Sequence, residues 1–235
     1  MNIDWASAAW IYVVFVFSTT LHEAAHAWTA LKFGDDTAHR GGQVSLNPVP
    51  HIRRSPFGMV LVPLLTLLTS RGGFMIGWAS TPYNPQWAMT SPRRSALMAL
   101  AGPASNLLLV LLAWAGMMLC VKSGVMAVIA DPSKGVSLLD VVGPLQGRLW
   151  PTAATLLSVL FSLNLLLMVL NLMPIPPFDG ASLPLLAMSD ESARRYIVWR
   201  QQKGGAMALI GLVILYSCFG YIFEPVWTTA VGFLK

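Results

Sequence analysis

The sequence contains few charged residues: Asp, Glu, Lys and Arg make up 11% of its 235 residues, whereas 55% are hydrophobic. Its mean hydropathy is +0.63. A soluble domain of this length needs a largely polar surface, and there are too few charged side chains here to form one. The composition therefore excludes an ordinary soluble domain. It predicts a polytopic membrane protein whose single domain covers residues 1–235 and whose partner is the lipid bilayer.

Cysteine is also scarce. Cys120 and Cys218 both fall inside apolar segments, where a free thiol behaves as a small hydrophobic residue. No basic cluster interleaved with aromatic residues lies outside those segments, so we expect no nucleic-acid partner despite the net charge of +5. The residues before the first apolar run include Asp4 but no Lys or Arg, which disfavours a secretory signal.

Four apolar segments are long enough to cross a bilayer, which needs about 20 residues. They cover residues 5–33, 95–121, 152–173 and 205–223. A shorter run, 57–69, precedes a stretch rich in Gly and Pro that opposes a continuous helix. We therefore expect an all-α bundle of about four to six transmembrane or re-entrant helices. The core covers about 5–190, with 205–223 as an additional C-terminal helix.

The stretch after residue 69 is expected to contain a short re-entrant strand or hairpin, with 74–80 as its most strand-like part. An ordinary exposed loop is the alternative. Trp78 and Trp87 in this region can serve as interfacial anchors, the common role of tryptophan at membrane edges.

Orientation follows from the basic residues, because Lys and Arg are enriched in cytoplasmic loops. They gather after the first span, before the second and between the last two: Lys32, Arg40, Arg53, Arg54, Arg93, Arg94, Arg194, Arg195, Arg200 and Lys203. These three regions are therefore expected to be cytoplasmic. Lys122, Lys134 and Arg148 oppose this scheme from the other side.

The stretch TTLHEAAHAWTALKFG, residues 19–34, carries the strongest chemical signal. His22, Glu23 and His26 form the pattern H-E-x-x-H. On a helix, histidines four residues apart lie on one face and can share one zinc ion, while the adjacent glutamate can hold water. Zinc lowers the pKa of that water, and Glu23 can accept its proton and pass it to the leaving amine. A polar patch facing the bundle interior is the alternative.

Two histidines need at least a third protein ligand. The candidates are His39, His51 and the acidic residues. Asp179 in NLMPIPPFDGAS stands out, because prolines break the preceding span and both it and the histidines reach the cytoplasmic half of the membrane. Asp179 can equally be the N-cap of the following helix.

A third element, AGPASN, begins the outward-running span with Gly102 and Pro103. Asn106 is an uncharged donor at about the depth of the expected zinc, where an amide can stabilise an oxyanion. Its other possible role is hydrogen bonding between helices, which Asn164 and Asn171 are also expected to serve.

The motifs HEAAH, GPASN and NLMPIPPFDG occur in the order and spacing of the site-2 protease family of intramembrane zinc metalloproteases, and GGQVSLNPVPHIRRSPFG and GWASTPYNP resemble its compact bacterial and archaeal members. The similarity covers about residues 10–190. The chain departs from many relatives in having Arg53 and Arg54 after His51, and Ala181 and Ser182 after the Asp-Gly pair.

This resemblance implies one zinc ion held by His22, His26 and Asp179, with Glu23 as general base and acid and Asn106 assisting substrate or oxyanion binding. It implies a multi-pass protein of a bacterial or archaeal cell membrane that cuts transmembrane substrates near the cytoplasmic face. A zinc-binding transporter or a non-proteolytic membrane scaffold is the rival hypothesis, which Glu23 disfavours because a transport site needs no base. A peptidase of soluble peptides is disfavoured by the small polar surface.

Overall fold

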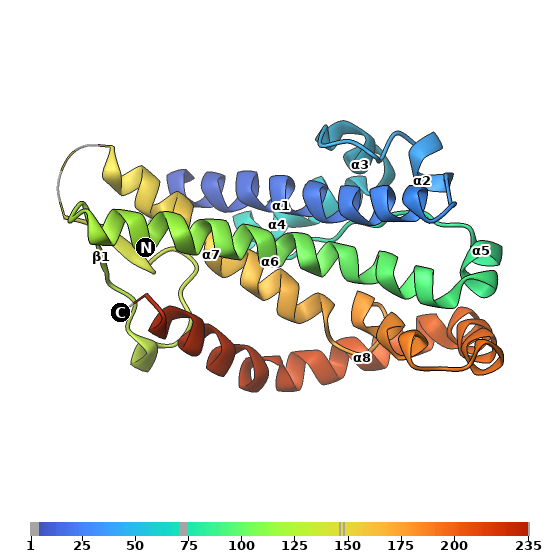
Figure 1. Cartoon of the computed structure of the whole chain (residues 1–235). Helices are drawn as coiled ribbons and strands as arrows, with labels where there is room; N and C mark the ends of the chain where they lie inside the picture. Colours follow the sequence, from blue (N-terminus) through green and yellow to red (C-terminus); the bar gives the residue numbers. More distant parts are fainter. Residues whose placement is uncertain (1–4, 71–74, 146, 148, 235) are drawn as a thin grey trace.

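Three long helices pack side by side at the centre of the structure: α1 (Trp5–Lys32), α6 (Pro92–Lys122) and α7 (Trp150–Asn171). The computed structural model describes residues 5–70, 75–145, 147 and 149–234. Figure 1 shows a fourth long helix, α8 (Asp190–Gly232), along one side of this group. Helix α1 begins and helix α8 ends at the end of the bundle where β1 is found.

The long helices confirm the expected spans. Four of the described helices are long and apolar enough to cross a membrane, and a fifth span is added if one bent pair counts as a single crossing. The structure is therefore an all-α polytopic membrane protein, as the composition predicts. The last helix is longer than the 205–223 expected, because α8 starts at Asp190 and carries its basic residues within its own first turns.

Two short helices at one end of the bundle begin at Asn-Pro pairs. Asn47 accepts a hydrogen bond from the Val49 N–H at the start of α3 (Pro48–Arg54), and Asn84 accepts one from Gln86 at the start of α5 (Pro85–Thr90). Proline follows each cap and fixes a helical φ angle where no N–H is needed. These elements and α2 (Thr37–Arg40) lie together at the end opposite β1 (Figure 1).

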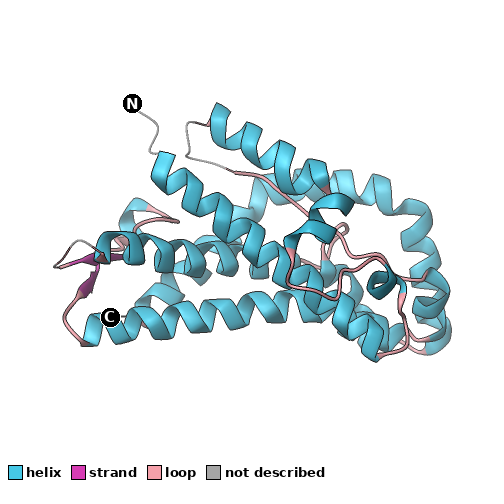
Figure 2. Cartoon of the chain, turned by 90° about the horizontal axis from the view of Figure 1, so that it is seen from above, coloured by secondary structure: helices cyan, strands magenta, loops and turns pink. Residues whose placement is uncertain are grey.

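The fifth apolar run forms a bent pair. It begins with a single π-helical turn, η1 (Phe57–Leu61), and continues as α4 (Val62–Thr69), and the axis of this run turns by 109° from that of α3. The chain then returns along the bundle through residues 75–84 without helix or strand (Figure 2). This excursion has the course expected of a re-entrant segment.

The strand expected at 74–80 is not formed. Phe74 lies outside the described residues, and 75–80 have no partner strand. Instead the Trp78 N–H donates to the Gly58 carbonyl, and the Ser80 carbonyl accepts from Gln43 and Arg54. The neighbours of this segment are helices and side chains, which can satisfy single backbone groups but cannot form a ladder.

A small antiparallel sheet occurs elsewhere, in the connection between α6 and α7. Strands β1 (Met126–Val128) and β2 (Val142–Pro144) pair with Ala127 opposite Gly143, and the 3-10 turn η2 (Pro132–Lys134) lies between them. Val141 and Val142 are buried against the ends of the helices. This connection therefore closes the bundle at the end away from α3 and α5.

Candidate metal centre

The H-E-x-x-H motif lies in the buried second half of α1. His22, Glu23 and His26 are each about 5% exposed, although they are surrounded by a largely apolar helix. The helical period places the two imidazoles on one face, with ring centroids 4.6 Å apart. Both rings therefore face one position, with their Nε2 atoms 3.0 Å apart.

Asp179 reaches the same position from the other end of the chain. α7 ends at Asn171, three prolines prevent its continuation, and Asp179 becomes the first residue of the 3-10 helix η3 (Asp179–Leu186). A Cβ atom at Gly180 would collide with the carbonyls of Leu172 and Met173. Only glycine allows this close return, so the Asp-Gly pair is required to bring the carboxylate back to α1.

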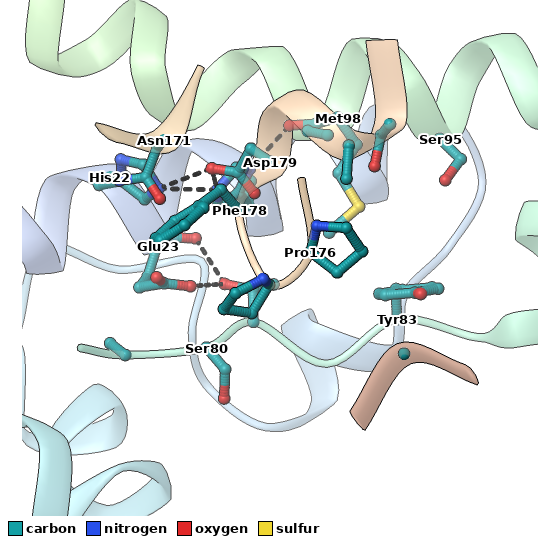
Figure 3. Close-up of a pocket in the computed structure, with 18 of the residues that line it drawn as sticks. His22, Glu23, Ser80, Tyr83, Ser95, Met98, Asn171, Pro176, Phe178 and Asp179 are labelled. Atoms are coloured by element: carbon teal, nitrogen blue, oxygen red, sulfur yellow. Dashed lines mark hydrogen bonds and ion pairs between the residues drawn. The ribbon is translucent and has the colours of Figure 1, made fainter. Parts of the chain in front are cut away.

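Three ligand atoms converge. One oxygen of Asp179 lies 3.1 Å from Nε2 of His22 and 3.2 Å from Nε2 of His26, and the two Nε2 atoms are 3.0 Å apart. Figure 3 shows Asp179 facing His22 across the pocket. The alternative of Asp179 as a helix N-cap is not realised, because Phe178 occupies that position. His51 is buried in α3 and bonds the Ser45 carbonyl, so it takes no part in this group, and His39 lies on α2.

The remaining ring nitrogens are occupied. Nδ1 of His26 is 2.7 Å from the carbonyl of Met98, and Nδ1 of His22 is 2.6 Å from Oδ1 of Asn106. Both acceptors are oxygens, so each Nδ1 carries a proton, and Nε2 is the nitrogen of each ring that can bind a metal ion. This is the state in which imidazoles bind metal.

Gly102 leaves room for the imidazoles of His22 and His26. AGPASN lies within α6, about two and a half turns after its first residue, and not at the start of the span as expected. A Cβ atom on Gly102 would collide with Nε2 of both His22 and His26. Pro103 follows inside the helix. The glycine is therefore needed for the close approach of α6 to α1 beside the imidazoles.

Glu23 lies beside this group and has a partner of its own. Residues 75–84, which have neither helix nor strand, are called the extended segment below. The hydroxyl of Thr81 in this segment is 2.7 Å from the Glu23 carboxylate and 2.9 Å from the Glu23 carbonyl. A hydroxyl carries one hydrogen, and the carboxylate is the stronger acceptor. Thr81 therefore orients the Glu23 side chain. It had no signal in the sequence, because a single threonine in a loop belongs to no motif.

A pocket of about 380 Å³ opens onto these side chains. Its walls come from α1, α6, η3, the start of α8 and the extended segment, whose Ser80 and Tyr83 lie across from Ser95 and Met98 (Figure 3). Asn171 also lines it, with its amide donating to the Leu167 carbonyl. This volume suits a short length of extended peptide or a small molecule.

Asn106 faces away from the pocket. It is completely buried, it lies on the far side of His22 from Asp179, and its amide nitrogen donates to Asn164 at 2.9 Å. In this arrangement the amide hydrogens do not point at a bound substrate. The oxyanion role stays a prediction, and the observed partners favour contact with His22 and with the neighbouring helix.

The donor set fits a zinc ion. His22, His26 and Asp179 offer two imidazole nitrogens and one carboxylate oxygen that lie within 4.8 Å of one another. Two nitrogens and an ionised carboxylate are the ligands of catalytic zinc, with a fourth position left for water or substrate.

Comparison with known proteins identifies relatives. A family model described as peptidase family M50 matches residues 10–217. YwhC of Bacillus subtilis, a proposed zinc metalloprotease, is 33% identical over 172 residues, which are 73% of this chain and 65% of YwhC. Rip2 of Mycobacterium tuberculosis, also a proposed zinc metalloprotease, is 32% identical over 199 residues, which are 85% of this chain and 63% of Rip2. The chain thus spans slightly less than two thirds of these relatives. No solved structure matches it significantly.

Proposed function

The chain belongs to peptidase family M50, the site-2 protease family, and we propose that it is an intramembrane zinc metalloprotease that hydrolyses peptide bonds within or near the transmembrane segments of membrane proteins. The observation that carries this proposal is the convergence of His22, His26 and Asp179 beside Glu23, inside a bundle of apolar helices. Ionisable side chains at such a position are expensive to keep and are functional by default.

His22, His26 and Asp179 hold the zinc ion, one per chain. When bound there, zinc polarises the scissile carbonyl and makes water a competent nucleophile at neutral pH. Glu23 takes a proton from the attacking water and returns it to the leaving amine. Thr81 keeps the Glu23 carboxylate aimed into the pocket by donating to it. Asn106 can reach a developing oxyanion only if its amide leaves Asn164, so direct oxyanion binding requires a rearrangement.

The substrate segment must be unwound, because the carbonyl of a helical peptide bond is not accessible to attack. The extended segment offers a place to hold it. Trp78 and Ser80 direct their backbone groups toward Gly58 and toward Gln43 and Arg54. In an extended chain successive residues direct their N–H and C=O groups to opposite sides, so those of Ala79 face the pocket that it lines. A substrate strand can pair there and place its carbonyl near the metal.

We place the active site toward the cytoplasm. The metal ligands lie in the half of the bundle that is closed by α2, α3, α5 and the first turns of α8 (Figure 1), and the segments at this end carry most of the basic residues. Positively charged loops face the cytoplasm in membrane proteins. Cleavage at this depth releases a substrate fragment toward the cytoplasm, as expected for regulated intramembrane proteolysis.

The proposal is tested by cleavage of a panel of single-span substrates in liposomes, comparing the wild type with Glu23→Gln and measuring bound zinc in both. Glu23→Gln should lower turnover by about 10²- to 10⁴-fold, the usual contribution of a general acid–base, and keep its zinc. Near wild-type turnover in Glu23→Gln would refute this mechanism. A folded wild type that binds no zinc would overturn the assignment, and zinc binding without cleavage of any substrate would favour a transporter or scaffold.

Strand pairing has a separate test. Ala79→Pro removes an N–H that faces the pocket, whereas Thr81 and the metal ligands are untouched. Cleavage should fall while zinc affinity stays at the wild-type value. Ala79→Val, which keeps the N–H, is the matched control and should cleave like the wild type; equal cleavage by the proline and valine variants would remove strand pairing from the mechanism.

A further inference from the structure

A series of hydrogen bonds between buried amides connects His22 to two neighbouring helices. Oδ1 of Asn106 on α6 contacts Nδ1 of His22, and the Asn106 amide nitrogen donates to Oδ1 of Asn164 on α7. The Asn164 amide nitrogen in turn donates to the Leu160 carbonyl at 2.8 Å and to the Ser18 hydroxyl at 2.9 Å. Asn106, Asn164 and Ser18 are completely buried. Each hydrogen-bonding group of this series therefore has its partner inside the protein.

The backbone carbonyl of Leu160 determines which atom donates and which accepts in each of these hydrogen bonds. The carbonyl of Leu160 can only accept, so the Asn164 atom that faces it must be nitrogen, and the Asn164 oxygen must face Asn106. That oxygen also only accepts, so Asn106 must present its nitrogen to Asn164 and its oxygen to His22. An oxygen at Nδ1 requires a proton on Nδ1 of His22.

We infer that Asn106 and Asn164 are positioning residues that fix the tautomer and the ring orientation of His22, so that its Nε2 is the nitrogen that binds the metal. This inference rests on the proposed zinc site and goes beyond the ligand set. Partners that hold the outer nitrogen of a metal-binding imidazole orient the ring, and losing one usually lowers metal affinity by about 10- to 100-fold. The backbone carbonyl of Leu160 fixes the orientation of both amides, because it can only accept a hydrogen bond.

The two histidines differ in how they are supported. His26 bonds directly to the backbone carbonyl of Met98, which no side-chain substitution removes. His22 depends on two side chains, and each is an amide that can rotate by 180° when its partner is lost. This pair of amides is therefore a part of the metal site that side-chain substitutions outside the ligand set can break.

The test compares the zinc affinity of purified variants in detergent, by competition with a chelator, with their unfolding stability. Asn106→Leu removes the acceptor and should weaken zinc binding by about 10- to 100-fold. Asn106→Asp keeps an oxygen at Nδ1 but places its second oxygen against Oδ1 of Asn164, so it should lose stability and still bind zinc within about threefold of the wild type. Asn164→Leu frees the Asn106 amide to flip, so its zinc affinity should lie between those of the two Asn106 variants.

Ser158→Ala is the matched control. Ser158 is a completely buried polar residue on α7, and its hydroxyl accepts from the N–H groups of Val141 and Val142, away from the metal site. It should lose stability and keep wild-type zinc affinity. If Asn106 serves only to hold helices together, its variants should behave like Ser158→Ala, with zinc affinity unchanged in the folded protein, and that result would overturn the inference.

The tautomer is also read directly, which keeps the inference testable if Asn106→Leu does not fold. In the zinc-loaded wild type with ¹⁵N-labelled histidine, NMR should show the His22 proton on Nδ1 and metal on Nε2. The opposite assignment would overturn the inference. Equal zinc loss in Asn106→Asp and Asn106→Leu would also overturn it. A wild type without zinc would instead refute the proposed function, so the two failures are distinguishable.

Discussion

The same helices form two different interiors. At the end nearer α3 and α5, the buried faces of the central helices are polar: Ser18, His22, Glu23, His26, Asn106 and Asn164. At the end nearer β1 they are mainly apolar: Val110, Ala113, Met117, Phe161 and Leu165 pack with Phe223 and Trp227 of α8, and Ser158 and Ser162 on α7 are buried polar exceptions. On α6 the change occurs within about one turn, because Asn106 precedes Val110.

The difference separates function from stability. In the polar half each contact is directional, and removing one group leaves its partner without a hydrogen bond or the metal without a ligand. In the apolar half the contacts are non-directional, and a smaller side chain costs packing but changes no geometry at the site. Substitutions in the two halves should therefore change different measurements.

Asp179→Ala is expected to have the largest effect. A four-coordinate zinc site binds with about 10–16 kcal/mol, so one of its four ligands contributes about 2.5–4 kcal/mol, or roughly 10²- to 10³-fold in affinity. Zinc affinity should fall by about that factor, with cleavage lost, while the metal-free protein keeps its helical content. Zinc binding within tenfold of the wild type would mean that another residue completes the site.

Gly102→Ala should lower zinc affinity nearly as much, although it replaces no metal ligand. The added methyl group would collide with Nε2 of both His22 and His26. Zinc affinity should fall by about a hundredfold, at the upper limit for residues that support ligands. Gly220→Ala on α8, where an added methyl group meets open space, is the matched control and should bind zinc like the wild type. Unchanged zinc affinity in Gly102→Ala would show that α6 can move away from α1.

Met117→Ala tests the apolar half. Met117 is completely buried among apolar side chains, and a truncation of this kind costs about 3 kcal/mol, or roughly a hundredfold in the folding equilibrium. Unfolding in detergent should shift accordingly, while the folded fraction keeps its zinc affinity. If Met117→Ala weakened zinc binding as strongly as Gly102→Ala does, the two halves would be coupled and the comparison would fail.

The sequence predicted which side chains converge better than it predicted the residues that contact them. His22, Glu23 and His26 lie in one helix, so their spacing alone places them together, and the prolines before Asp179 marked where the chain leaves its span. Asn164 was expected to hydrogen-bond between helices, as it does with Asn106, but nothing in the sequence indicated its connection to His22, because Asn106 is 58 residues away. For the same reason the role of Thr81 was not predicted.

Strand positions were the weakest part of the prediction. Residues 75–80 have the composition of a strand but no chain to pair with, whereas β1 and β2 each have three residues and form because their connection folds back on itself. Spans were predicted well since bilayer thickness requires long apolar runs. Pairing of short strands depends on which segments the packed helices bring together, and a single sequence does not contain that information.

Thr81→Val should have the smallest effect, and it should change kcat alone. It replaces the hydroxyl that donates to the Glu23 carboxylate with a methyl group of similar size. A hydrogen bond to a charged group contributes about 1.5 kcal/mol or more, so kcat should fall by about tenfold with KM and zinc affinity unchanged. Thr81→Ser keeps the hydroxyl and should restore most of the rate. Because Thr81 belongs to the segment that we propose pairs with substrate, wild-type kcat in Thr81→Val would mean that this segment binds substrate without orienting the base.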